Sequence, residues 1–142
     1  MTERTLILVK PDGYRRKKMG EILKRVEEKG YDIVAADLRT VSKELLDQHY
    51  NELVDKPFYP GLVEYMTSGP ILAIVAQGDS VVQGWRTLLG NTQPSKAAPG
   101  TIRGDLARDW PGDEVRNIAH GSDSVESAER EIALWFPNLS NN

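Results

Sequence analysis

The chain has 142 residues, enough to bury one hydrophobic core, so we expect a single domain over residues 1–142 with a C-terminal tail at 136–142. It has no cysteine, which excludes disulfides, zinc fingers and thiolate catalysis, and its two histidines are too few for a transition-metal site made by protein alone. A net charge of −3 gives no general attraction to nucleic acid or to an anionic membrane, and no stretch approaches the ~20 apolar residues of a membrane span. We therefore expect a cytoplasmic protein without a membrane partner or a specific nucleic-acid partner.

Residues 5–9 form a continuous apolar run that is too short for a helix, which predicts a buried central strand. This strand ends at Lys10-Pro11-Asp12-Gly13. Lys10 is thereby left at the C-terminal edge of the strand, where ligand sites often form. The alternative is an ordinary solvated lysine beside a turn. A basic run at residues 15–18 precedes a helix that ends at Gly30, and we interpret this run as a solvated surface rather than an anion site.

Residues 31–41 are rich in Ile, Val and Ala and predict a second strand. Ser42 is expected to cap a helix that carries His49 and Tyr50 on or beside its apolar face. These two side chains are either core residues with a satisfied polar tip or ligand contacts. Phe58 stands between two prolines, where it is either exposed and able to stack on a base or packed between two helices.

Residues 71–76 predict a third buried strand, and Gly78 with Asp79 is expected to open a helix that contains Arg86 and ends at Gly90. Residues 91–114 show no regular pattern. A loop of this length in a compact domain suggests a role in function or assembly.

The stretch around His120 contains a strand, a turn and a helix. An apolar run at 115–119 leads to His120 and a Gly-Ser-Asp-Ser turn, where Asp123 is expected to cap the last helix. On a helical wheel Glu131 lies within about 20° of Ser124, so its carboxylate can point toward His120. A carboxylate near one ring nitrogen leaves the other free as a base or nucleophile. The alternative is a structural histidine in a capped loop.

Several scattered side chains suit phosphate oxygens: Lys10, Arg86, Thr92, Arg103, Asn117 and His120. The chain has neither a P-loop sequence nor the glycine-rich and catalytic-loop patterns of protein kinases. His120 is therefore the candidate nucleophile, because an imidazole can offer a neutral nitrogen at physiological pH.

Four motifs together resemble the nucleoside diphosphate kinase family over about residues 4–136: Lys10-Pro-Asp-Gly13, Ser68-Gly-Pro70, Pro99-Gly-Thr-Ile-Arg103-Gly-Asp105 and Asn117-Ile-Ala-His120-Gly-Ser-Asp-Ser124. The resemblance implies ping-pong transfer of the γ-phosphoryl group of a nucleoside triphosphate, typically ATP, to a nucleoside diphosphate. A phosphohistidine on the δ nitrogen of His120 is the implied intermediate, and base selectivity is implied to be low.

The resemblance also implies roles for individual residues. The residues that would bind the sugar and phosphates are Lys10, His49, Arg86, Thr92, Arg103 and Asn117. Phe58 would stack on the base with Leu62 at its edge. Tyr50 would lie beside His120, and Ser122 and Glu131 would orient its ring. One Mg²⁺ would bridge phosphate oxygens, with Asp123 reached through water at most.

Alternation of strands and helices alone predicts a parallel doubly wound sheet. The resemblance implies instead an α+β, ferredoxin-like βαββαβ sandwich with a four-stranded antiparallel sheet covered by helices, and we adopt it. It also implies a homo-oligomer, for which we favour a hexamer over a tetramer. The segment 106–115 is about four residues longer than the family pattern, which leaves Val115 as a candidate for the second face of the base.

Two hypotheses from other classes remain at this point. The chain could be a sensor that binds nucleotide without chemistry, or a phosphocarrier whose histidine is charged by a partner protein.

Overall fold

The computed structural model describes residues 2–110 and 116–139. Its elements in chain order are β1 (Thr2–Val9), α1 (Pro11–Arg15), α2 (Met19–Glu28), β2 (Asp32–Arg39), α3 (Lys43–His49), α4 (Tyr59–Met66), β3 (Ile71–Asp79), α5 (Val81–Leu89), η1 (Pro94–Lys96), α6 (Ile102–Leu106), β4 (Ala119–Gly121) and α7 (Val125–Trp135). Within this described part of the chain, no helix has the length and apolar character needed to cross a membrane.

The four strands form one sheet in the order β2-β3-β1-β4, and every neighbouring pair is antiparallel. This confirms the ferredoxin-like α+β fold and shows that the parallel doubly wound sheet is wrong. The reason is that β3 returns between β1 and β2 instead of extending the sheet from β2. Strand alternation along a sequence does not specify that order.

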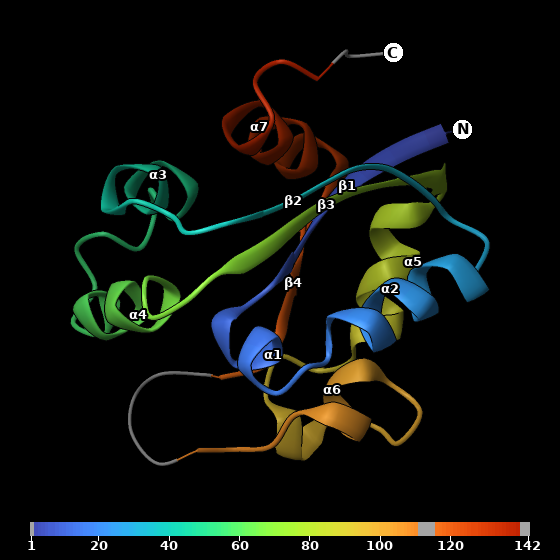
Figure 1. Cartoon of the computed structure of the whole chain (residues 1–142), viewed down its shortest axis with the longest axis horizontal. Coiled ribbons are helices and arrows are strands. Elements are labelled where there is room, and N and C mark those ends of the chain that lie inside the picture. Colours follow the sequence, from blue (N-terminus) through green and yellow to red (C-terminus); the bar gives the residue numbers. More distant parts are fainter. Residues whose placement is uncertain (1, 111–115, 140–142) are drawn as a thin grey trace.

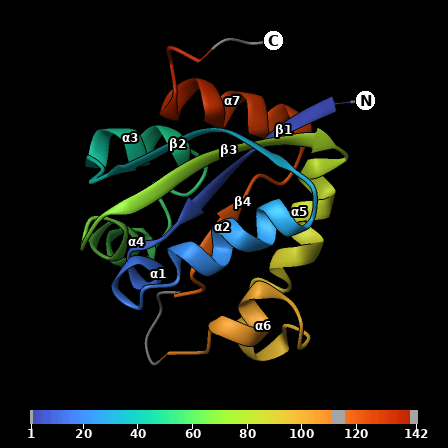
Figure 2. The same cartoon turned by 45° about the vertical axis from the view of Figure 1, so that its right-hand side comes forward.

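Helices cover both faces of the sheet (Figures 1 and 2). Along β1, Ile7 and Val9 point into a core shared with α2 and α5, whereas Leu6 and Leu8 point into a core shared with α3, α4 and α7. All four side chains are fully buried. The continuous apolar run of residues 5–9 is therefore explained by a central strand that is covered on both sides.

Several local predictions differ from the structure. The segment 91–114, which shows no regular pattern in sequence, contains η1 and α6 in its described part, and Thr101 caps α6 by accepting a hydrogen bond from the Gly104 N–H. The strand expected at 115–119 is β4, which includes His120 itself.

Gly78 and Asp79 belong to β3, because residues 77–79 pair with the first residues of β1, and the following helix begins at Val81. Pro11, Asp12 and Gly13, expected to end the strand beside a turn, are the first residues of α1, because the fixed φ of Pro11 suits the first helical position. Ser124, not Asp123, caps α7 by accepting a hydrogen bond from the Ser127 N–H.

Candidate active site

His120 is presented by the short strand β4 directly after a strained turn. Ile118 has a φ of +71°, which is rare for a β-branched residue, and the Ala119 N–H donates to the Asn117 carbonyl at 2.8 Å to close a γ-turn. The Lys10 N–H holds the Ile118 carbonyl at 2.8 Å. The main chain before His120 is thus fixed from β1, and strain of this kind is often found at functional sites.

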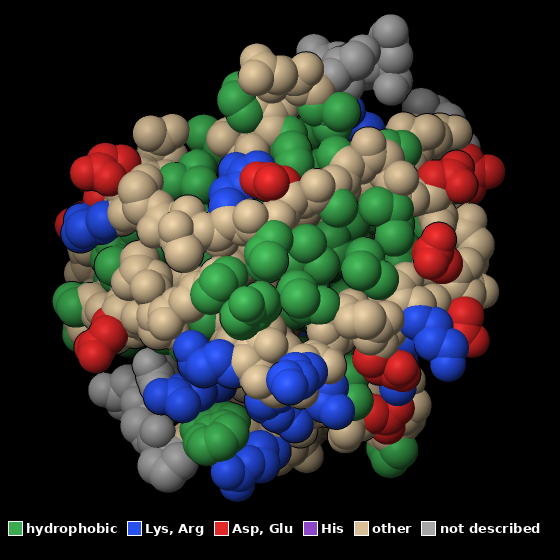
Figure 3. Space-filling view, in the orientation of Figure 1, with side chains coloured by type: hydrophobic (Ala, Val, Ile, Leu, Met, Phe, Trp, Pro, Cys, Tyr) green, Lys and Arg blue, Asp and Glu red, His purple; other side chains and the backbone are tan. Residues whose placement is uncertain are grey.

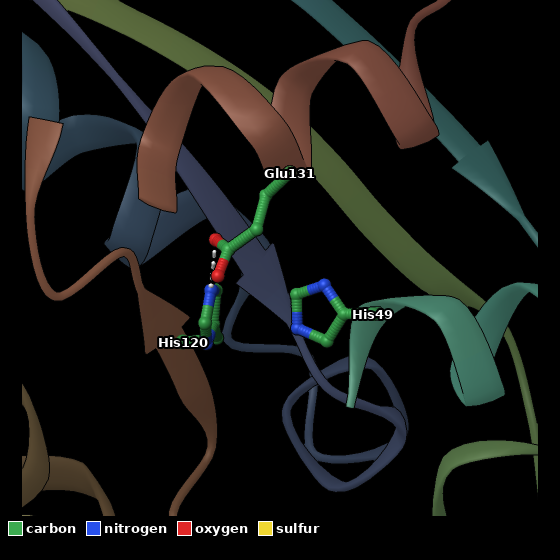
Figure 4. A group of neighbouring side chains, drawn as sticks. All are labelled: His49, His120 and Glu131. Atoms are coloured by element: carbon green, nitrogen blue, oxygen red, sulfur yellow. Dashed lines mark hydrogen bonds and ion pairs between the residues drawn. The ribbon is translucent and has the colours of Figure 1, made fainter. Parts of the chain in front are cut away.

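A chain of hydrogen bonds fixes the imidazole of His120. The Leu6 N–H donates to Ser122 Oγ at 3.2 Å, and the Ser122 hydroxyl donates to Glu131 Oε1 at 2.7 Å. The same carboxylate oxygen lies 2.9 Å from Nε2 of His120 (Figure 4). With a carboxylate at Nε2, the ring proton is held on that nitrogen and the lone pair is left on Nδ1.

The buried carboxylate of Glu131 is held in its charged form. Burial raises its pKa, but the hydrogen bond and charge of His120, together with His49 and Ser122, lower the pKa of Glu131 overall. The contact that the helical wheel predicts between Glu131 and the His120 turn is therefore present, and it supplies a negative charge behind the ring.

A cavity of about 480 Å³ opens on the other side of His120. It is lined by seven of the residues singled out in the sequence, namely Lys10, Tyr50, Arg86, Thr92, Arg103, Asn117 and His120. Sequence reasoning missed Gln83, Thr87 and Asn91, which also line it. The signal was available for two of them, because Gln83 precedes Arg86 by three residues and Thr87 by four, and these spacings place helical side chains on one face.

Two buried cations give this cavity a positive potential. Lys10 is 8% exposed, and its Nζ donates to Asn117 Oδ1 at 2.7 Å. Burial and, second, the charge of Arg103 lower the pKa of Lys10 to about 8, although the nearby Asp12 raises it. Lys10 is thus not the ordinary solvated lysine of the alternative interpretation. Unfavourable burial of a cation is relieved when an anion binds beside it.

Arg103 is the second buried cation. Its Nε, Nη1 and Nη2 atoms donate to the carbonyls of Asn117, Gly90 and Ala119 at 3.3, 3.1 and 2.7 Å. Burial, followed by the charge of Arg86, lowers the pKa of Arg103 to about 10. The guanidinium has five N–H donors, so it clamps the main chain around His120 and still keeps N–H groups for a ligand.

His49 and Tyr50 lie at the C-terminal end of α3. The rings of His49 and His120 have centroids 5.0 Å apart, and those of His49 and Tyr50 are 4.5 Å apart. Both residues border a second cavity of about 410 Å³ that His120 and Asp123 also line. Tyr50 therefore lies beside the site between the two cavities, whereas Asp123 is exposed on the side away from the main cavity.

His49, His120 and Glu131 offer nitrogen and oxygen atoms within 4.8 Å of one another, the one such group in the described part of the chain (Figure 4). However, Nδ1 of His49 accepts a hydrogen bond from the Trp135 indole at 3.1 Å. A metal on Nε2 would then require His49 to lose its remaining ring proton or to break that bond. The group is accordingly a poor transition-metal site.

The residues expected to hold the base are not gathered in the main cavity. Phe58 immediately precedes α4 and is 41% exposed, as one of the two sequence interpretations has it. Neither Phe58 nor Leu62 lines either cavity described above. Val115, the candidate for the other face of the base, lies outside the described residues.

The fold and the cavity define the class: an α+β protein with a cavity lined by Lys10, Arg86 and Arg103 beside a histidine held by a carboxylate. A sequence model of the family described as nucleoside diphosphate kinase matches residues 3–140. A Streptococcus uberis protein of that name is 53% identical over 140 residues, covering 97% of this chain and 96% of its own. The nucleoside diphosphate kinase A1 of Xenopus laevis is 57% identical over 134 residues, covering 94% and 84%.

Solved structures agree with the sequence relatives. The nucleoside diphosphate kinase of Halobacterium salinarum in complex with CDP has a TM-score of 0.91 at 44% identity, over 97% of this chain and 90% of that one. The apo enzyme of Encephalitozoon cuniculi has a TM-score of 0.88 at 43% identity, over 94% and 88%. This chain belongs to the nucleoside diphosphate kinase family and is a phosphotransferase. The family, the fold and the enzyme class expected from the sequence motifs are thereby confirmed.

Proposed function

We propose that the chain transfers the γ-phosphoryl group of a nucleoside triphosphate to a nucleoside diphosphate through a phosphohistidine on Nδ1 of His120. The observation that carries this proposal is the 2.9 Å contact between Glu131 and Nε2 of His120. Because the carboxylate engages Nε2, Nδ1 is the nitrogen with a lone pair for attack. One nucleotide site then serves both half-reactions in a ping-pong mechanism.

Residues of the main cavity bind the phosphates in this proposal. Arg86, Arg103 and Thr92 contact phosphate oxygens, Lys10 contacts the phosphates and the sugar 3′-hydroxyl, and Asn117 holds the sugar. These cations offset the charge that spreads over the equatorial oxygens during transfer. The buried positions of Lys10 and Arg103 support the assignment, since their charges are costly until an anion binds.

Four further residues surround the nucleophile His120 in this proposal, namely His49, Tyr50, Ser122 and Glu131. His49 contacts the phosphates, Tyr50 lies beside the reacting ring, and Ser122 and Glu131 orient it. As the phosphoryl group joins Nδ1, the ring becomes positively charged, and the Glu131 carboxylate stabilises that charge through Nε2–H.

Mg²⁺ is the proposed cofactor, and it would offset negative charge on the phosphates. Among the described residues that line the main cavity, none is acidic, so the metal would be held mainly by phosphate oxygens and water. Asp123 lies in the neighbouring cavity beside His120, where only a water-mediated contact is expected.

The base is proposed to stack on the exposed ring of Phe58, with Leu62 at its edge. Stacking uses the π-face that every base has and reads no base-edge groups. Low selectivity among bases follows, so ATP can act as donor for GDP, UDP and CDP alike.

A homo-oligomer is proposed, with a hexamer favoured over a tetramer. Strand β2 lies at the edge of the sheet, and its Val34 and Leu38 are 40% and 48% exposed. Hydrophobic side chains gather on this face of the molecule, where β2 and α2 lie (Figure 3). An unpaired apolar edge strand favours pairing with a second copy. Light scattering distinguishes a hexamer from a tetramer.

A cytoplasmic location is also proposed for the chain, without a membrane or a specific nucleic acid as partner.

Labelling with γ-³²P-ATP and Mg²⁺ tests the proposed chemistry. We expect an acid-labile, base-stable phosphoprotein that GDP, UDP and CDP each discharge. No phosphoprotein would favour the sensor hypothesis, and labelling that needs a partner protein would favour the phosphocarrier. A His120→Ala variant that still forms labelled protein and turns over would refute the mechanism.

A further inference from the structure

The hydrogen bond between His49 and Trp135 determines where the proton of His49 lies. The indole Nε1–H can only donate, and it lies 3.1 Å from Nδ1 of His49. Nδ1 must therefore carry a lone pair, and the proton of the neutral ring must sit on Nε2. Trp135 is fully buried near the C-terminal end of α7 and His49 is 4% exposed, so water does not compete for this bond.

The protonated nitrogen faces the reacting histidine. In Figure 4 one nitrogen of the His49 ring points up toward α7, the helix that carries Trp135, and the other lies on the edge nearest His120. Arg130 fixes the end of α3 by donating to the carbonyls of Gln48 and His49 at 3.0 and 3.1 Å. In the described residues no acceptor is hydrogen-bonded to Nε2 of His49, so its N–H is available to a ligand.

Several charges act on His49 from the surrounding elements. Burial, followed by the charges of His120, Arg130 and Lys10, lowers the pKa of His49 to about 3, although Glu131 raises it. Protonation of His49 Nδ1 would also place its N–H against the Nε1–H of Trp135, and the indole cannot accept a hydrogen bond there. Neutrality matters for the reaction, since a cation 5.0 Å from the His120 ring would make that ring a weaker nucleophile.

We propose that Trp135 is a positioning residue that holds His49 as a neutral hydrogen-bond donor, with its Nε2–H directed toward the His120 ring, where the phosphoryl group of the bound nucleotide is transferred. The inference rests on the proposed function, which assigns His49 to the phosphates. A neutral donor binds the phosphate oxygens without adding positive charge beside the nucleophile. The fixed ring also avoids a flip that would place a C–H group toward the ligand.

Nitrogen NMR on ¹⁵N-histidine protein tests the proton position directly. The chain has two histidines, so a His120→Ala variant assigns the signals of His49. In the wild type we expect an unprotonated Nδ1 and a protonated Nε2 that do not titrate down to pH 4. In Trp135→Phe the midpoint of His49 should rise by at least about one pH unit, because the opposing donor is gone. A protonated Nδ1 in the wild type, or an unchanged titration in Trp135→Phe, overturns the proposal.

Kinetics then test the effect on the reaction. Trp135→Phe should lower kcat/KM on the order of tenfold, as expected for a disturbed hydrogen bond to a charged group. Ile71→Ala is the control, because it opens a cavity in the same hydrophobic cluster without removing a hydrogen bond to His49. In a His49→Gln background the amide N–H needs no partner to fix it. There Trp135→Phe should lower kcat/KM no more than Ile71→Ala does.

Two results separate this inference from the proposed function. If Trp135→Phe changes the NMR titration but loses no more kcat/KM than Ile71→Ala, the positioning role is refuted, while phosphorylation of His120 stands. If the wild type forms no phosphohistidine, the proposed function fails whatever the proton position of His49 is.

Discussion

Replacing Glu131 with glutamine tests the most specific feature of the site. The carboxylate is buried, accepts a hydrogen bond from Ser122 at 2.7 Å and lies 2.9 Å from Nε2 of His120. Glu131→Gln keeps the shape and one acceptor oxygen but removes the negative charge. The variant therefore isolates the electrostatic part of the contact from its geometry.

The expected loss follows from the strengths of the two kinds of hydrogen bond. A bond to a charged group contributes about 1.5–3 kcal/mol and a neutral one about 0.5–1.5 kcal/mol. The difference of roughly 1–2 kcal/mol corresponds to a phosphorylation rate lower by about 5- to 30-fold. Glu131→Ala also removes the orienting contact and leaves Ser122 without its acceptor, so we expect it to be slower still.

Single-turnover quench of the labelled phosphoprotein measures the rate, and calorimetry measures ADP affinity. Affinity should be nearly unchanged, because Glu131 does not line the main cavity. Glu129→Gln is the matched control: it makes the same charge change on the same helix, where its partner is Arg4 rather than His120. A phosphorylation rate in Glu131→Gln and Glu131→Ala equal to that of Glu129→Gln would refute the orienting role.

Three further predictions concern charge and packing at the site. Because the pKa of Lys10 is lowered to about 8, the lysine loses its charge above that pH, and KM for ADP measured from pH 7 to 9.5 should rise in the wild type but not in Lys10→Arg. His49 has a pKa of about 3 when folded against about 6.5 when unfolded, so the unfolded chain binds the proton first. As the pH falls from 6.5 to 3, the free energy of unfolding should thus fall by a few kcal/mol in the wild type and by less in His49→Gln. Urea titration measures both. A Cβ at Gly13 would lie 2.8 Å from Val9 Cγ1 and 3.0 Å from Ile118 Cγ1, so Gly13→Ala should lower stability by about 1–3 kcal/mol, whereas Gly20→Ala, with open space around it, should not.

Features with a strong local signal could be predicted from the sequence. The apolar run of residues 5–9 indicated a central strand, and all of Leu6 to Val9 is buried. The Ser42 cap of α3 was also correct, since its side chain accepts from the Leu45 N–H. Helical periodicity also showed that Glu131 can point toward His120, and the two side chains are in contact. In each case the relevant atoms are close in sequence or belong to one element.

Features that depend on distant contacts could not be predicted in this way. The antiparallel order of the sheet depends on β3 pairing with both β1 and β2, and strand alternation does not encode that choice. Residues 77–79 have the turn-like composition of a helix start, but pairing with the N-terminal end of β1 keeps them extended. Burial of Lys10 required Asn117 and Arg103 to be brought against it across more than ninety residues. Motif resemblance supplied this long-range information, which composition and periodicity do not contain.

The position of His120 between opposite charges has a chemical consequence. Glu131 approaches Nε2 from behind the ring and is absent from the described lining of the main cavity, whereas Lys10 and Arg103 lie on the cavity side. A carboxylate in the cavity would repel phosphate, and a cation behind the ring would weaken the nucleophile. In the observed arrangement the cations attract the nucleotide to the Nδ1 side. The carboxylate then stabilises the positive charge that the ring acquires when Nδ1 bonds to phosphorus, so each charge assists a different step without opposing the other.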